Sequence, residues 1–239
     1  MTDFRTGEVL LIHKPLKWTS FQVVNKMKWL IKNHPSLILD GKKVQPKIGH
    51  AGTLDPLATG LLIVCTGKKT KSIESYQAQE KEYTGTFYIG ATTACFDLEK
   101  EIDARFPTEH ITDELIQETT KQFIGKIQQT PPIYSAIKID GKRAYDIARA
   151  GQTAEIKPKE IEIKVFEITR IALPEVDFRV VCSKGTYIRS LARDFGLALN
   201  SGAHLTALCR TRIGDYKLSD AMSIEEFEKS LEIEIATDI

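Results

Sequence analysis

One aspartate in a glycine-rich segment is the residue of this sequence best suited to chemistry. Residues 49–60 read GHAGTLDPLATG, so that Asp55 stands directly before Pro56. Pro56 disfavours the helical conformation at Asp55, and the glycines allow tight turns or close backbone approach. The carboxylate would then project from a fixed loop beside apolar leucines, as a nucleophile or a general base does. The alternative, a simple Asp-Pro turn with structural glycines, is the commoner one for a lone aspartate in a loop.

The whole segment resembles the catalytic motif of the TruB family of tRNA pseudouridine synthases, which convert uridine 55 of the T loop to pseudouridine. Four more segments resemble the family in the same order, and the likeness extends from about residue 7 to residue 213. They are residues 13–20 (HKPLKWTS), 81–85 (KEYTG), 183–194 (SKGTYIRSLARD) and 202–210 (GAHLTALCR). The resemblance implies an α+β pseudouridine synthase catalytic fold, with a mostly antiparallel mixed sheet flanked by helices.

The resemblance also implies roles for three catalytic residues. Asp55 would act on the ribose, either by adding to C1′ as a nucleophile or by removing a proton from C2′ as a base. Tyr83 would stack on the target base, and Arg189 would pair with the catalytic aspartate. From the residues alone, a tyrosine packed in the core is the favoured interpretation of Tyr83, and a surface cation or a phosphate contact is the favoured interpretation of Arg189.

Further residues are expected to bind the substrate. His50 resembles the family histidine that packs into the T loop when the target nucleotide leaves its stack, although a loop histidine bonded to backbone is the alternative. Tyr187 and Leu208 match positions that line the uracil pocket, where ordinary core packing is the competing interpretation. Gly52 and Thr53 are also expected to bind the substrate. The lysines expected to contact phosphate are Lys14, Lys17, Lys68, Lys69 and Lys71.

The charge of the 239-residue chain is unevenly distributed along the sequence. Its formal total is only +1. Residues 14–71 nevertheless hold eleven lysines against two acids, a balance of +9, whereas residues 219–239 have a balance of −6 and residues 99–118 of −5. A basic surface of this kind suits a polyanion such as tRNA, while lysines scattered over solvated faces remain an alternative.

Composition excludes several other classes of protein. With 42% hydrophobic and 27% charged residues, the chain should form a core rather than remain disordered. The four cysteines, at 65, 95, 182 and 209, form no C-x-x-C pair, so we expect free thiols and neither a disulfide framework nor a metal site. We expect no cofactor, no signal peptide and no membrane span, and hence a cytoplasmic protein.

The expected elements form one domain over residues 1–239. Strands are predicted at 8–12, 61–65, 82–89, 126–129, 133–139, 160–171 and 176–183, and helices at 21–31, 112–124, 145–150, 186–199 and 224–233. Thr19 and Ser20 are candidate N-caps of the first helix, in which the apolar residues Phe21, Val24, Met27 and Ile31 recur at the spacing of one helix face. Residues 129–159 are expected to be an insertion that contacts RNA, and residues 219–239 to form a short acidic helix. Too few residues follow Leu208 for the PUA-type RNA-binding domain of larger family members.

The leading hypothesis is therefore a stand-alone enzyme whose partner is the T stem and loop of tRNA. We expect it to need no guide RNA and no protein partner. Three alternatives are a tRNA-binding or folding factor without catalysis, a guide-RNA-dependent rRNA pseudouridine synthase, and an enzyme that hydrolyses nucleosides.

Overall fold

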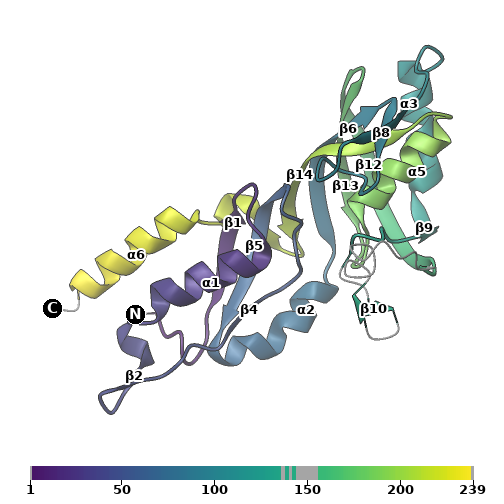
Figure 1. The fold of residues 1–239 in the computed structure, drawn as a ribbon. Coiled ribbons are helices and arrows are strands. Elements are labelled where there is room, and N and C mark those ends of the chain that lie inside the picture. Colours follow the sequence, from purple (N-terminus) through teal and green to yellow (C-terminus); the bar gives the residue numbers. More distant parts are fainter. Residues whose placement is uncertain (1, 136–137, 140–141, 144–155, 238–239) are drawn as a thin grey trace. The chain divides into compact units, whose positions relative to one another are not determined.

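The computed structural model describes residues 2–135, 138–139, 142–143 and 156–237, and these form two compact units (Figure 1). The first unit contains Met1–Lys81 and Cys209–Ile239, and the second contains Glu82–Leu208. The chain passes between them within strands β6 (Lys81–Ile89) and β14 (Ala203–Ile213). The hydrogen-bonded strand order is β1-β5-β14-β6-β13-β12-β9, with antiparallel pairing wherever the register is described. The predicted α+β class with a mostly antiparallel sheet is confirmed.

The first unit consists of a small sheet covered by helices on both faces. Its main strands are β1 (Val9–Lys14), β4 (Ile48–His50), β5 (Ala58–Thr66) and β15 (Tyr216–Lys217), and its α-helices are α1 (Ser20–Ile31), α2 (Ile73–Ala78) and α6 (Ile224–Thr237). The remaining elements are β2 (Ile38–Leu39), β3 (Lys42–Lys43), η1 (Pro35–Leu37), η2 (Gly67–Ser72) and η4 (Leu218–Asp220).

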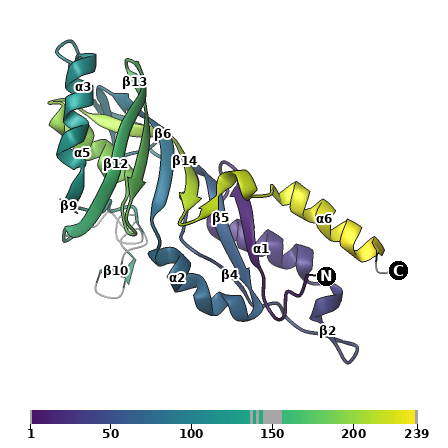
Figure 2. The ribbon, with the colours of Figure 1, turned by 180° about the vertical axis from the view of Figure 1, so that it is seen from behind.

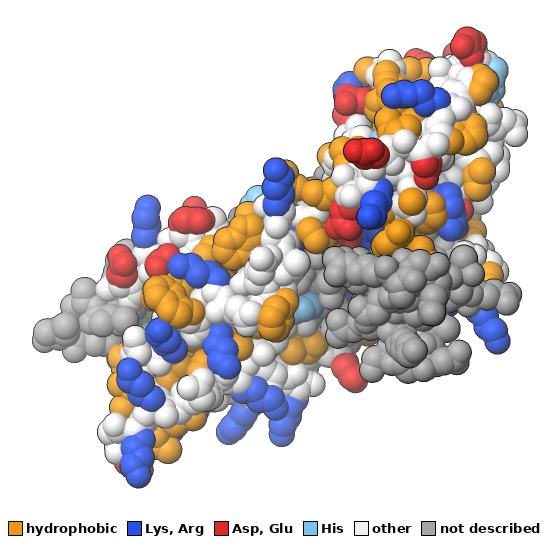
Figure 3. Space-filling view, viewed as in Figure 1, with side chains coloured by type: hydrophobic (Ala, Val, Ile, Leu, Met, Phe, Trp, Pro, Cys, Tyr) orange, Lys and Arg blue, Asp and Glu red, His pale blue; other side chains and the backbone are white. Residues whose placement is uncertain are grey.

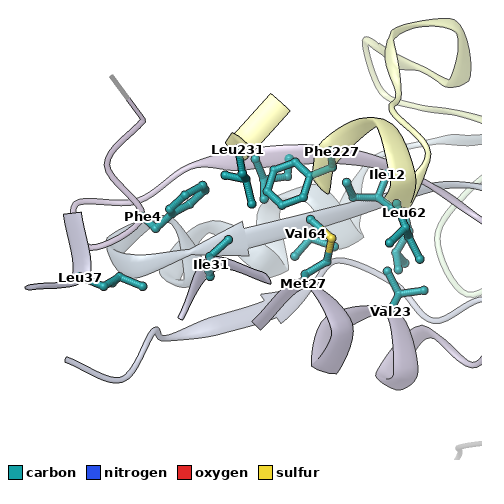
Figure 4. Packing of buried hydrophobic residues seen from close by; sticks show 12 residues of the cluster. Phe4, Ile12, Val23, Met27, Ile31, Leu37, Leu62, Val64, Phe227 and Leu231 are labelled. Carbon is teal, nitrogen blue, oxygen red and sulfur yellow. The ribbon is translucent and has the colours of Figure 1, made fainter. Parts of the chain in front are cut away.

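Alternation along β1 and β5 builds two apolar layers in this unit. Side chains of successive residues point to opposite faces of a strand. One layer gathers residues of β1 and β5, such as Ile12 and Val64, against α1 and α6, as Figure 4 shows. On the other face, Leu61, Ile63 and Cys65 pack with residues near α2. Burial raises the pKa of Cys65 to about 11, so its thiol stays protonated at neutral pH.

Helix α1 begins as the sequence predicts. The Thr19 hydroxyl accepts a hydrogen bond from the N–H of Gln22, whose side chain in turn accepts one from the Thr19 N–H, forming a capping box. The prediction that Phe21 joins the buried face is wrong, because its side chain is 68% exposed. Ser20 and Val23 take that side of the first turn, and Met27 and Ile31 continue the buried face as expected.

The second unit packs helices against longer strands. Its strands are β7 (Ala91–Thr93), β8 (Ile102–Arg105), β9 (Gly125–Gln129), β10 (Lys138–Ile139), β11 (Lys142–Arg143), β12 (Lys159–Ala172) and β13 (Glu175–Cys182), and its helices are α3 (Asp113–Thr120), η3 (Lys121–Phe123) and α5 (Ile188–Ala198). Seen from behind in Figure 2, α3 lies beside β12. In the described part of the chain no helix is long and apolar enough to cross a membrane.

A cluster of phenylalanines forms the centre of the second unit. Phe87 of β6 stacks on Phe178 of β13 with ring centroids 4.1 Å apart. Phe166 of β12 meets both rings edge-on, and Phe195 of α5 lies 5.3 Å from Phe166. Aromatic pairs prefer such offset or T-shaped geometries. This cluster fixes α5, and thereby the residues at its start, onto the strands.

One predicted strand differs from the structure, one long strand was not predicted, and one predicted helix cannot be compared with the structure. Residues 133–135 form no strand, so the strand predicted over 133–139 is wrong there, and β10 covers only its end. The sequence also missed β14, because its alternation is broken by Thr206, Cys209 and Arg210. The helix predicted at 145–150 and most of the insertion lie outside the described residues.

Candidate active site

The loop that carries Asp55 connects two hydrogen-bonded strands. β4 pairs antiparallel with β5, and residues 51–57 join them. Leu54 is buried, whereas Asp55 is half-buried and its neighbour Thr53 is exposed. The Asp55 carbonyl accepts a hydrogen bond from the N–H of Ala58 (3.0 Å), which closes a turn around Pro56. The side chain of Asp55 is thus attached to a short loop whose two ends are held in the sheet.

Ser20 anchors this loop directly next to Asp55. Its buried hydroxyl accepts a hydrogen bond from the Leu54 N–H (2.9 Å) and lies 3.2 Å from the Leu54 carbonyl, to which it donates. From the sequence, Ser20 is only a candidate helix cap. Ser20 is in fact the first residue of α1, and its side chain connects that helix to the loop.

Ser20→Ala is expected to lower both the stability of the protein and its activity. The substitution leaves a buried N–H and a buried carbonyl of Leu54 without their partner, which costs about 1–3 kcal/mol of unfolding free energy. Urea denaturation would measure that loss, and kcat should fall because Asp55 is less firmly placed. Thr19→Ser, which keeps a capping hydroxyl outside the loop, is the control; equal effects of both variants on kcat would contradict the anchoring role.

Lys14 is a second anchor, and the phosphate contact predicted for it is wrong. Its side chain has no exposed surface, and Nζ donates hydrogen bonds to the carbonyls of Pro15 (3.0 Å), Trp18 (2.6 Å) and Pro56 (3.4 Å). Burial lowers the pKa of Lys14 to about 8, against the attraction of Asp55, which raises it. The strand alternation Leu10, Ile12, Lys14 places this lysine on the buried face of β1 and could have indicated it.

Arg210 is the third anchor, and the sequence analysis assigned it no role. It is 1% exposed. Its Nε donates to the Leu61 carbonyl (2.8 Å) and Nη2 to the Gly52 carbonyl (3.0 Å), so it holds both the loop and the strand that follows. Gly52 has a φ of +94°, which a side chain would strain.

Gly60 allows β5 to approach the backbone of Arg210. Its φ is +107°, and a Cβ added to it would stand 2.3 Å from the Arg210 carbonyl oxygen. Gly60→Ala is therefore expected to lower the free energy of unfolding by about 2 kcal/mol, measured by urea denaturation. Gly125→Ala is a matched control, since Gly125 has a φ of +96° but no atom within 4 Å of the added Cβ. If Gly60→Ala lowers the free energy of unfolding no more than Gly125→Ala does, this close approach is not important for stability.

His50 lies in β4, half-buried, immediately before the loop. Burial lowers the pKa of its imidazole, and the positive charge of Arg210 lowers it further. Both effects favour the neutral ring at pH 7. An uncharged imidazole is suited to stacking or hydrogen bonding with a base rather than to pairing with phosphate.

In the second unit, Arg189 stands at the start of α5 in a buried polar cluster. Its Nη1 donates to the Cys95 carbonyl (3.3 Å) and Nη2 to the Tyr134 carbonyl (2.9 Å). Its Nε lies 3.7 Å from a carboxylate oxygen of Asp97, and both side chains are 5% exposed. Asp97 is not among the predicted site residues, because nothing in its local sequence pattern marks it as buried. A second carboxylate is thus associated with the arginine predicted to pair with Asp55.

Tyr187 is fixed by Gln129, another residue the sequence analysis did not assign. The Gln129 side chain accepts a hydrogen bond from the Tyr187 N–H (2.9 Å) and donates one to the Tyr187 carbonyl (3.2 Å). Thr130 follows, and its carbonyl accepts hydrogen bonds from Ser190 and Arg193. These bonds hold the end of β9 against the first turns of α5.

The predicted site residues are divided between the two units. Lys14, His50, Gly52, Thr53 and Asp55 belong to the first unit, and Tyr83, Tyr187, Arg189 and Leu208 belong to the second. Tyr83 is buried in β6, and Leu208 is half-buried in β14. The pairing of Arg189 with Asp55 and the shared uracil pocket therefore stay predictions. Within the described residues, no three His, Cys, Asp or Glu side chains gather as a metal site would require.

Comparisons with known proteins find related sequences over nearly the whole chain. A family described as TruB family pseudouridylate synthase (N terminal domain) matches residues 40–188, and one described as tRNA pseudouridylate synthase B C-terminal domain matches residues 189–237. Proteins named tRNA pseudouridine synthase B from Flavobacterium johnsoniae and Phocaeicola vulgatus are 65% and 59% identical to the chain over 230 residues. Those alignments cover 96% of this chain and 98% and 95% of the two relatives.

A solved structure shares the fold. The chain superposes on the crystal structure of a Cbf5-Nop10-Gar1 complex with a TM-score of 0.74 and 27% sequence identity. The superposition covers 99% of this chain but only 58% of the matched chain.

Proposed function

Because the chain belongs to the TruB family of pseudouridylate synthases, we propose that it converts uridine 55 in the T loop of tRNA to pseudouridine. The relatives that match it over almost their full lengths are named tRNA pseudouridine synthase B, which supports tRNA as the substrate. The target position rests on the resemblance of residues 49–60 to the family's catalytic motif. With tRNA as substrate, the protein acts in the cytoplasm, without guide RNA or protein partner.

The reaction is an isomerisation within one nucleotide. The bond from uracil N1 to ribose C1′ breaks, the base turns, and a new bond joins C5 to C1′. C5 loses its proton and N1 gains one, so no atom is gained or lost overall. Asp55 drives the first step as a nucleophile at C1′ or as a base at C2′.

The observation that carries this proposal is the anchoring of the Asp55 loop. Ser20, Lys14 and Arg210 hold backbone atoms at Leu54, Pro56 and Gly52, on both sides of the aspartate. A carboxylate fixed before the substrate arrives loses little freedom on reaching the transition state, which lowers the barrier. This arrangement favours catalysis over a factor that only binds and folds tRNA.

The second unit supplies the other proposed groups. Arg189 orients Asp55 by a charge-assisted hydrogen bond, and Asp97 in turn orients Arg189. Tyr83 stacks on the target base, while Tyr187 and Leu208 enclose the uracil ring. His50 and Thr53 contact the T loop.

Exposed lysines of the first unit supply contacts with RNA phosphates. Lys17, Lys68, Lys69 and Lys71 are all exposed. Figure 3 shows Lys and Arg side chains gathered along the edge of the first unit near β2 and α2. Such contacts position RNA without reading its sequence, and tRNA affinity should fall steeply with salt.

The test uses tRNA transcripts labelled with tritium at uracil C5. The protein should release tritium from a transcript with uridine at position 55, in an amount equal to one uridine per tRNA. A transcript with cytidine at that position should release none. Release from both transcripts would refute the target position, and binding without release would refute the enzyme. Free uracil among the products would indicate hydrolysis instead.

A further inference from the structure

An open pocket of about 240 Å³ lies in the first unit, outside the proposed active site. It is bounded by the segment before β4, by the start of η2 and by Arg5 near the N-terminus. None of its lining residues belongs to the Asp55 loop, and none is one of the three anchors of that loop.

Backbone hydrogen bonds hold the walls of this pocket together. The Gly67 N–H donates to the Lys47 carbonyl (2.8 Å), and the Lys68 N–H donates to the Thr6 carbonyl (3.0 Å). Gly67 has a φ of +50°, and a Cβ added there would stand 2.2 Å from the Arg5 carbonyl oxygen. Three segments that are distant in the sequence therefore meet at a glycine that no larger residue can replace. The pocket exists before any ligand binds.

The rim of the pocket is strongly basic. Its lining includes Arg5, Lys47, Lys68 and Lys71, each of them exposed, and none of its lining residues is acidic. The acid next to the rim, Asp3, accepts hydrogen bonds from the backbone N–H groups of Arg5 and Thr6. Four cations around one concave surface attract a phosphate, because each adds a favourable interaction with the same anion.

The floor of the pocket is apolar. Leu37 and Pro46 are buried beneath it, and Val44 is 36% exposed at its side. The Val44 N–H donates to the Leu37 carbonyl (2.8 Å), which keeps these residues together. A bare phosphate gains nothing from such a floor. A ligand with an apolar face next to its phosphate, as a nucleotide has, gains contact with both.

From this combination we propose that the pocket binds one nucleotide of the RNA substrate other than the target uridine. The phosphate lies among the four cations, and the base or ribose lies on the apolar floor. The proposal rests on the proposed function for the identity of the RNA. It assigns to Arg5 and Lys47 a part in tRNA binding, in addition to the lysines that the sequence singled out as phosphate contacts.

The test compares two charge-reversed double variants by equilibrium binding to tRNA. Arg5→Glu/Lys47→Glu should raise the Kd about tenfold or more and make the salt dependence of binding shallower by about one phosphate contact. Lys217→Glu/Lys229→Glu alters the charge equally at exposed sites of the same unit and should change the Kd less than threefold. Similar weakening by both pairs would overturn the proposal, as would no weakening by the first.

Two further experiments test whether the pocket binds a nucleotide rather than phosphate alone. Val44→Ser should weaken tRNA binding without changing the salt dependence, and an unchanged Kd would overturn the role of the apolar floor. Uridine monophosphate at millimolar concentration should compete with tRNA on the wild type, whereas inorganic phosphate should compete less. If uridine monophosphate binds but the first double variant binds tRNA normally, the pocket serves free nucleotides and the RNA proposal fails. These binding assays need no turnover, so their outcome is separate from the tritium test of catalysis.

Discussion

Asp55→Asn is expected to lower kcat for pseudouridine formation by about 10³-fold or more, with the Kd for tRNA changed less than about threefold. Asparagine has nearly the same size and can occupy the same turn before Pro56. Its amide can neither add to ribose C1′ nor accept a proton from C2′, so both routes to bond cleavage are closed. Removing the reacting group of an enzyme commonly costs this much. Tritium release at saturating tRNA measures kcat, and filter binding measures the Kd.

Asp215→Asn provides the matched control. Asp215 is exposed in the turn between β14 and β15, so the same chemical change there should leave kcat within about twofold of the wild type. An Asp55 variant that kept more than a tenth of the wild-type rate would remove Asp55 from the chemistry. It would also leave the tRNA-folding alternative as the better account of the protein.

Arg210→Met is expected to lower the free energy of unfolding by about 3–5 kcal/mol. Methionine fills part of the space but leaves the Gly52 and Leu61 carbonyls without their buried donor, each at a cost of about 1–3 kcal/mol. The measurement is urea denaturation.

The same variant should raise the pKa of His50. The positive charge of Arg210 holds that pKa down, so its removal moves the imidazole toward its ordinary value, which NMR titration can follow. Arg212→Met is the control, because Arg212 lies on the same strand but pairs with Glu80 in a partly exposed position. We expect it to cost no more than about 1 kcal/mol. Comparable losses in both variants would refute a special role for Arg210.

Local signals in the sequence predicted the start of α1 and the position of the Asp55 loop correctly. The capping residue Thr19 and the glycines around Asp55 act within a few residues of the structure they determine. Phe21 was misassigned because helical spacing alone cannot tell which of two neighbouring stripes faces the core. Lys14 was misassigned because lysines are rarely buried, although its strand position indicated the buried face.

The partners of the site residues could not be predicted, since they are distant in the sequence. Arg210 reaches the Gly52 carbonyl across 158 positions, and Gln129 reaches Tyr187 across 58. Asp97 meets Arg189 only because the segment after β7 passes near the start of α5. Such contacts depend on how the strands pair, and no propensity or spacing within one segment encodes that pairing.

The hydroxyl that anchors the Asp55 loop belongs to the first residue of a helix, and helix ends open locally far more often than helix centres. Each time the first turn of α1 frays, the hydrogen bonds between Ser20 and Leu54 break, and Asp55 is no longer held in position. The reciprocal hydrogen bonds of Thr19 and Gln22 make such openings rarer. The capping box at the start of α1 therefore helps to keep the Asp55 loop in one conformation.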